Sequence, residues 1–198
     1  MLFKTLGDKS APAVLFFHAM GVTGESSEPV AAELADRFFC IMPTSTVYCA
    51  GQTYADKAGE VRQIEEFLRG QGVERVEMVV ASSIGADLAM AFLTQTQIPV
   101  GHVFFVAAGK ALSYGNIRRQ MADSLEDKPF PPLSKELQKR CFFEFGSAED
   151  HFKYRAAVMQ AYPAGNFPVF DGYNHMQYQI RDPKGFAAMM ELPFLQKE

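Results

Sequence analysis

Residues 76–90 have the sequence VEMVVASSIGADLAM. An apolar run rich in valine stops abruptly at a small-x-Ser-x-Gly pattern, and a helical pattern follows. We expect a tight strand-to-helix turn here, with small residues on either side that let the backbone pass close by. Such a turn holds the Ser83 hydroxyl clear of the backbone and directs the first N–H groups of the helix at any oxygen that Ser83 attacks. Ser83 is therefore the candidate nucleophile.

The pattern begins with Ala81 instead of the commoner glycine, and it contains two adjacent serines. Only Ser83 fits it, because a pattern centred on Ser82 would place Ile84 where glycine is required. A buried strand, a turn and a helix with an incidental serine would look the same locally. The interpretation of Ser83 as a nucleophile therefore depends on the rest of the chain.

Apolar runs recur along the chain and alternate with amphipathic stretches. The runs expected to form strands are 2–6, 13–17, 38–42, 76–81, 102–107, 141–145 and 167–170. Several are apolar throughout, which is typical of strands buried on both faces of a parallel sheet. Helical patterns lie between them, with Pro29 suited to a first turn and Asp56 to a cap. This alternation predicts an α/β fold with a doubly wound, mostly parallel sheet of about seven strands.

One segment, residues 111–140, breaks this alternation. Its prolines at 129, 131 and 132 exclude one long helix, so two short helices with a kinked connection are expected. The segment is either a small lid over the site or an ordinary surface crossover. With 198 residues and no linker or repeat, the chain is expected to form one domain over residues 1–198.

The composition excludes several classes of function. A net charge of −4 gives no reason to expect nucleic acid or an anionic membrane as a partner. No apolar run reaches the ~20 residues that span a bilayer, and no signal peptide is evident. Three cysteines without a C-x-x-C pair fit a reducing cytoplasm. No metal cluster is expected from the spacing of His, Asp and Glu, and no cofactor motif occurs. The oligomeric state stays open.

A nucleophilic serine needs a base, and a histidine in a loop after a late strand would supply it. Four histidines are candidates. His18 and His102 fall at the end and the start of strands, and His151 begins a helix. His175 follows Gly172 in an irregular, polar loop after the last strand. We therefore predict His175 as the base.

The acid that orients this base should follow the preceding strand, 141–145. That strand ends at Gly146, and Glu149 and Asp150 come soon after it. Asp150 is predicted as the acid, with Glu149 as the runner-up. Acidic residues are also common at helix starts because they complement the helix dipole, and this explanation applies to at least one of the two.

Two backbone N–H groups should bind the developing oxyanion. One belongs to Ile84, next after the nucleophile. The other is predicted at Met20, with Ala19 second, in the loop after strand 13–17. His18 is then a structural residue whose ring bonds this loop.

Taken together, these motifs resemble those of a small α/β-hydrolase. HAMG at 18–21 is similar to the oxyanion loop of that family, ASSIG at 81–85 to its nucleophile elbow, GSAED at 146–150 to its acid turn and GYNH at 172–175 to its histidine loop. The order serine, acid, histidine is also that of the family. The resemblance implies an α/β-hydrolase fold with reduced N-terminal strands and a short lid.

Some features depart from the family pattern. Ala19 replaces a usual glycine in the oxyanion loop, and Asp150 lies one residue farther from Gly146 than is common, which keeps Glu149 as an alternative. The loop at 43–54 lacks a frequent glycine turn, and it is expected to form the pocket walls together with 111–140. Cys49 in that loop has no basic neighbour to activate it and is interpreted as a small buried residue.

The resulting hypothesis is a cytoplasmic serine hydrolase that cleaves a small carboxylic ester or thioester through an acyl-enzyme. Its catalytic residues would be Ser83, His175 and Asp150, and its partner a small acyl substrate. The same residues would also serve an acyltransferase, a C–C hydrolase or a cofactor-free haloperoxidase, because a fold does not fix a function. A non-catalytic protein that binds a small ligand is the further alternative.

Overall fold

The computed structural model describes residues 1–113 and 130–195. Its sheet has seven strands: β1 (Leu2–Leu6), β2 (Ala13–Phe17), β3 (Phe39–Thr44), β4 (Val76–Ser82), β5 (Val100–Val106), β6 (Cys141–Gly146) and β7 (Val169–Phe170). The predicted strands all exist, and their ends lie within two residues of those observed. The α/β fold class predicted from the sequence is therefore confirmed.

The strand order is β1-β3-β2-β4-β5-β6-β7. Only β1 runs antiparallel to its neighbour, β3, and the other recorded pairs are parallel. The order reverses direction between β2 and β4, as in doubly wound sheets, whose ligand sites lie at the carboxyl ends of the strands. The loops that follow β2, β4, β6 and β7 therefore open on the same edge.

The helices alternate with the strands. They are α1 (Glu28–Leu34), α2 (Lys57–Gly70), α3 (Gly85–Gln95), α5 (Lys135–Gln138), α6 (Arg155–Ala161), α7 (Gln177–Arg181) and α8 (Pro183–Leu195). Short 3₁₀ helices are η1 (Gly24–Ser27), η2 (Thr46–Tyr48), η3 (Gly109–Ser113) and η4 (Asp150–Tyr154). The predicted cap of α2 is confirmed, since the Asp56 carboxylate accepts the N–H of Gly59 at 2.6 Å.

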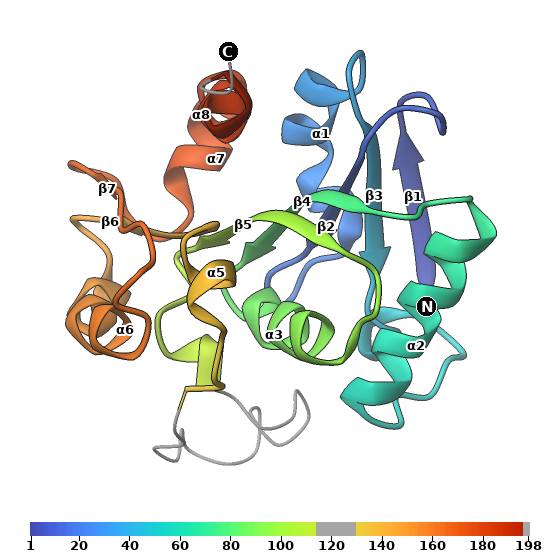
Figure 1. The fold of residues 1–198 in the computed structure, drawn as a ribbon, viewed down its shortest axis with the longest axis horizontal. Helices are drawn as coiled ribbons and strands as arrows, with labels where there is room; N and C mark the ends of the chain where they lie inside the picture. Colours follow the sequence, from blue (N-terminus) through green and yellow to red (C-terminus); the bar gives the residue numbers. More distant parts are fainter. Residues whose placement is uncertain (114–129, 196–198) are drawn as a thin grey trace.

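Each central strand contributes to two cores. In β2, Leu15 and Phe17 pack on one face with α2 and α3, whereas Val14 and Phe16 pack on the other with α1 and α8. Figure 1 shows the two layers, with α1 and α8 above the sheet and α2, α3 and α6 below it. Alternate side chains of a strand point to opposite faces, so a strand covered on both sides is apolar throughout.

The segment at 111–140, expected to be either a lid or a surface crossover, lies mostly outside the described residues, which omit 114–129. Its described flanks are the end of η3 and the short helix α5. In the described part of the chain, no helix combines the length and the apolarity needed to cross a membrane.

Candidate active site

Ser83 lies in the turn between β4 and α3. Its φ of 50° is in the left-handed region, which non-glycine residues adopt at some cost and mostly where the surroundings enforce it. Gly85 makes this turn possible, because a Cβ at that position would lie 2.4 Å from the carbonyl oxygen of Phe17. The elbow therefore packs directly against the end of β2 and presents Ser83 at the carboxyl edge of the sheet.

The neighbouring serine faces a different way. Ser82 is buried, and its hydroxyl is 3.1 Å from Oε1 of Gln179 on α7. This hydrogen bond ties the end of β4 to the helix that follows the histidine loop. The two serines therefore have different surroundings. Ser82 is hydrogen-bonded inside the fold, and Ser83 lines the pocket.

The structure brings His175 to Ser83. Nε2 of His175 is 3.0 Å from Oγ of Ser83, within the range for proton transfer between a nucleophile and a base. Nδ1 of the same ring is 2.9 Å from Oε2 of Glu149. Since a carboxylate only accepts, the ring proton sits on Nδ1, and Nε2 is left as the acceptor for the serine hydroxyl.

The acid beside His175 is Glu149, and the prediction of Asp150 for this place is wrong. The Glu149 side chain is fully buried, and its second oxygen accepts the N–H of Gly146 at 2.9 Å. Asp150 is exposed at the start of η4. The physical reason is the turn itself: three residues after the end of β6 the side chain points inward, and one residue later it points to solvent.

Gly146 lets the acid turn and the histidine loop come together. A Cβ at Gly146 would lie 2.1 Å from the carbonyl oxygen of Tyr173, so any side chain there would push the loops apart. The same carbonyl accepts the N–H of Ala148 at 3.1 Å. The relative position of Glu149 and His175 therefore depends on backbone contact between the loops after β6 and β7.

His18 holds the loop that follows β2. The N–H of Ser45 donates to its Nε2 (3.1 Å), so its proton is on Nδ1, which donates to the carbonyl of Ala19 (2.8 Å). Burial lowers the pKa of His18 and keeps this ring neutral. The prediction that His18 bonds the loop is thus confirmed.

The two predicted oxyanion donors, Met20 and Ile84, line the same pocket as Ser83 and His175. Within residues 1–113 and 130–195, no acceptor is recorded for the backbone N–H of either residue. Backbone donors that are free and face the reacting serine are what an oxyanion requires. Their place in the pocket is compatible with that role, which stays a prediction.

The pocket at the serine has a volume of about 330 Å³, and its described lining is Ala19, Met20, Ser83, Ile84, Ala111, His151, His175 and Met176. Of the expected walls, the 111–140 segment contributes Ala111. The 43–54 loop instead supports the oxyanion loop from behind, where the Tyr48 hydroxyl accepts the N–H of Gly21 at 3.1 Å. Cys49 is buried in that loop, as interpreted from the sequence.

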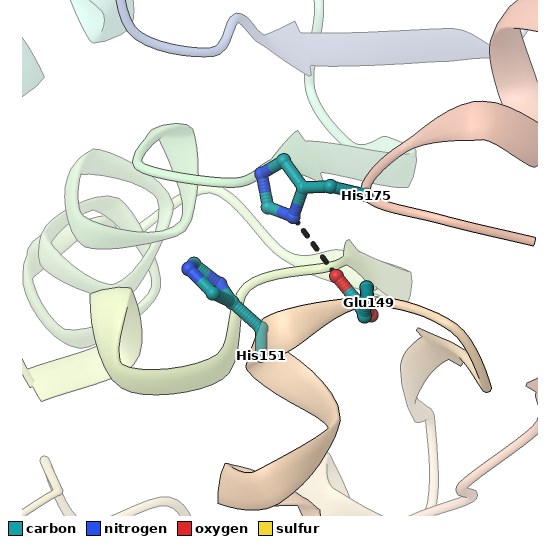
Figure 2. Close-up of side chains that lie close together, drawn as sticks. All are labelled: Glu149, His151 and His175. Atoms are coloured by element: carbon teal, nitrogen blue, oxygen red, sulfur yellow. Dashed lines mark hydrogen bonds and ion pairs between the residues drawn. The ribbon is translucent and has the colours of Figure 1, made fainter.

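His151 is a pocket residue that the sequence alone did not indicate. It is the second residue of η4, two residues after Glu149, and its ring centroid lies 4.6 Å from that of His175. Burial, and then the nearby His175, lower the pKa of His151. Contrary to the expectation from sequence spacing, Glu149, His151 and His175 form a group with a metal-ligand composition, whose ligand atoms lie within 4.8 Å of one another (Figure 2).

A second carboxyl group, Glu144, is buried on β6 beneath the histidine loop. It borders a small cavity that Tyr173, Met176 and Tyr178 also line. Among the described residues, neither of its carboxyl oxygens has a hydrogen-bond partner. Burial raises the pKa of Glu144 well above its ordinary value, which favours the neutral form of this side chain in the folded protein.

We expect Glu144→Met to stabilise the protein. The folded state binds a proton at Glu144 more tightly than the unfolded state, so between the ordinary and the raised pKa the free energy of unfolding falls as pH rises. Methionine removes this pH-dependent loss of stability and also the two carboxyl oxygens that lack partners among the described residues. The free energy of unfolding should therefore rise by roughly 1–3 kcal/mol at neutral pH. Urea denaturation across the pH range measures it.

The control is Glu66→Met, at an exposed position on α2. Its free energy of unfolding should change by no more than about 0.5 kcal/mol. A Glu144→Met protein that is less stable than wild type at neutral pH, or that keeps the wild-type pH slope, would show that the buried carboxyl is ionised and paired.

No protein-family model matches this sequence, and no curated protein matches it significantly. Solved structures do match it. MGS-MChE2, an alpha/beta hydrolase enzyme from the metagenome of lagoon sediments at Mar Chica, Morocco, has a TM-score of 0.72 at 13% identity, over 98% of this chain and 94% of that one. Carboxylesterase CesB from Bacillus subtilis has a TM-score of 0.68 at 13% identity, over 99% and 87%.

A variant of the meta-cleavage product hydrolase CumD also matches, with a TM-score of 0.69 at 15% identity, over 98% of this chain and 93% of that one. The fold is therefore that of the α/β-hydrolases. At such low identities the similarity establishes the fold and leaves the reaction to be argued from the site.

Proposed function

We propose that the protein is a serine hydrolase that cleaves a small carboxylic ester or thioester through an acyl-enzyme. One observation carries this proposal: an unbroken hydrogen-bonded series runs from Ser83 through His175 to the buried carboxylate of Glu149. A serine, a histidine and a carboxylate in this order are the parts that nucleophilic acyl transfer needs. The free cysteines favour a reducing compartment, so the cytoplasm is the proposed location.

The reaction would proceed in two halves. Nε2 of His175 takes the proton of Ser83 as Oγ attacks the carbonyl carbon of the substrate, and Glu149 stabilises the imidazolium through Nδ1–H. The N–H groups of Met20 and Ile84 bind the oxyanion. His175 then protonates the leaving alcohol or thiol, which departs. Water, deprotonated by His175, attacks the acyl-enzyme, and His175 returns the proton to Oγ of Ser83 as the acid is released.

Glu149 fits this role through its burial. A carboxylate with a fully buried side chain acts on His175 through a medium of low dielectric constant, where its charge stabilises the imidazolium more than an exposed carboxylate would. Its second oxygen is fixed by the N–H of Gly146, so the group is already oriented before substrate arrives. The replacement of aspartate by glutamate at this position keeps the chemistry and lengthens the side chain by one methylene.

The pocket supports a substrate of modest size. About 330 Å³ is at the lower end of the range for small-molecule sites. Met20 and Met176 border the reacting serine, and methionine adapts its shape to different apolar groups. We therefore expect the enzyme to prefer short acyl chains to long ones and to accept different leaving groups.

The test is a panel of p-nitrophenyl esters of increasing acyl length, with matched thioesters. Turnover that falls with acyl length, and an acyl adduct trapped on Ser83 by acid quench, are expected. An acceptor alcohol in a parallel arm separates transfer from hydrolysis, and a meta-cleavage dienone tests C–C hydrolysis. Absence of ester and thioester turnover by the folded protein would contradict the proposal, as would a faster reaction in either of the other arms.

A further inference from the structure

Two imidazoles share the wall of the pocket. His175 enters from the loop after β7, and His151 enters from the first turn of η4, beside Glu149 (Figure 2). Their ring centroids are 4.6 Å apart, and the rings meet at 64°. The hydrolytic mechanism uses one of these rings and assigns no step to the other.

The hydrogen bonds fix the same tautomer in both rings. Nδ1 of His175 faces the Glu149 carboxylate at 2.9 Å, and Nδ1 of His151 faces the carbonyl of Ala107 at 3.2 Å. Carboxylates and carbonyls accept and do not donate, so each Nδ1 carries the proton and each Nε2 carries a lone pair. Histidines that bind metals commonly donate their other ring N–H to a carboxylate or a backbone carbonyl in this way.

We propose that His151 and His175 bind a divalent transition-metal ion such as Zn²⁺ through Nε2, with Glu149 behind His175 as the compensating charge. The two rings line the same pocket with their centroids 4.6 Å apart, and one possible ligand atom from each of Glu149, His151 and His175 lies within 4.8 Å of the others. Zn–N bonds of about 2.0–2.1 Å place tetrahedral ligand nitrogens about 3.3 Å apart, so binding requires the half-buried His151 side chain to rotate until the two Nε2 atoms reach this spacing. Water fills the remaining positions from the pocket.

The consequence for the reaction rests on the proposed function. A metal ion at Nε2 of His175 occupies the lone pair that accepts the Ser83 proton, which is 3.0 Å away in the structure. The ion therefore inhibits hydrolysis reversibly and competes with substrate for the same space. Hard cations such as Mg²⁺ and Ca²⁺ prefer oxygen ligands and should not bind here.

Binding is tested first, without substrate. Isothermal titration of the full chain, free of a polyhistidine tag, with Zn²⁺ should give one site per chain. His151→Phe and His151→Gln should weaken it by at least about tenfold, because each removes a ligand. His102→Gln, which removes a histidine packed between Phe142 and Phe194, is the matched control and should keep the wild-type affinity.

Equal affinity of the wild type and both His151 variants would overturn the proposal. A test that needs no variant is the order of metals on the wild type: Cu²⁺ and Zn²⁺ should bind more tightly than Mn²⁺, and Mg²⁺ should not bind. Mg²⁺ binding as tight as that of Zn²⁺ would show a carboxylate site and contradict the assignment to imidazoles.

Inhibition of ester hydrolysis by Zn²⁺ is measured in a separate experiment. Each protein's rate with Zn²⁺ is divided by its own metal-free rate, and the concentration for half inhibition should rise by at least about tenfold in His151→Phe. Zn²⁺ binding that depends on His151 in a protein with no esterase activity would support the metal site and contradict the hydrolase. Zn²⁺ inhibition of an active enzyme that is unchanged in both His151 variants would support the hydrolase and overturn the metal site.

Discussion

Ser83→Ala should lower kcat for a p-nitrophenyl ester by a factor on the order of 10⁶, the loss seen when the nucleophile of a triad is removed. The methyl group leaves the elbow and His175 in place but cannot form the acyl-enzyme. The measurement is the steady-state rate against a short-chain ester, with the free energy of unfolding taken in parallel to show that the variant is folded.

The neighbouring serine supplies the control. Ser82→Ala makes the same chemical change at the adjacent residue. The Ser82 hydroxyl donates to Gln179 and not to His175. Its kcat should stay within about tenfold of wild type, with a modest loss of stability of about 1 kcal/mol. If Ser82→Ala were the inactive variant and Ser83→Ala the active one, the assignment of the nucleophile would be refuted.

Glu149→Gln should lower kcat by a factor on the order of 10⁴, because the amide can donate to Nδ1 and favour the wrong tautomer of His175. The amide has nearly the volume of the carboxylate, so the packing around the fully buried side chain changes little. The loss should appear in kcat more than in KM, since Glu149 does not line the pocket among its described residues.

Asp150→Asn is the matched control at the adjacent, exposed position. It makes the same chemical change without altering the carboxylate that faces His175, so its kcat should lie near that of the wild type. A larger loss from Asp150→Asn than from Glu149→Gln would mean that Asp150 replaces Glu149 at the histidine during the reaction.

The positions of the strands could be predicted from the sequence because a strand buried on both faces is apolar along its whole length. In β2 and β4 nearly every residue contributes to one of the two cores, so both strands are apolar runs that a single sequence displays. The strand ends were less accurate, for instance at β7, because hydrogen bonds to the neighbouring strand define them. The elbow at Ser83 was recognisable because its sharp turn restricts which residues fit.

The acid was harder to predict because Glu149 and Asp150 are adjacent and differ by one methylene. The useful pattern is the distance from Gly146: the side chain three residues on is buried, and the next is exposed. That distance matters because Gly146 packs against the carbonyl of Tyr173, and this contact fixes where the turn begins relative to the histidine loop. Residue type alone does not distinguish the two carboxylates, because either can orient a histidine.

The second pocket histidine could not have been predicted without the fold. His151 and His175 are separated by a helix and a strand, and they meet because β6 and β7 are parallel neighbours whose following loops open on one edge. The spacing of His and Glu in the sequence gives no sign of this meeting. The 4.6 Å between the rings is a consequence of strand order.

The most direct test of the account is labelling with a fluorophosphonate, followed by peptide mapping by mass spectrometry. We expect a single phosphonyl adduct on Ser83, lost in Ser83→Ala and formed far more slowly in His175→Ala, which lacks the ring 3.0 Å from the serine hydroxyl. A folded wild-type protein that takes up no label, or label that persists in Ser83→Ala, would contradict the claim that Ser83 is an activated nucleophile.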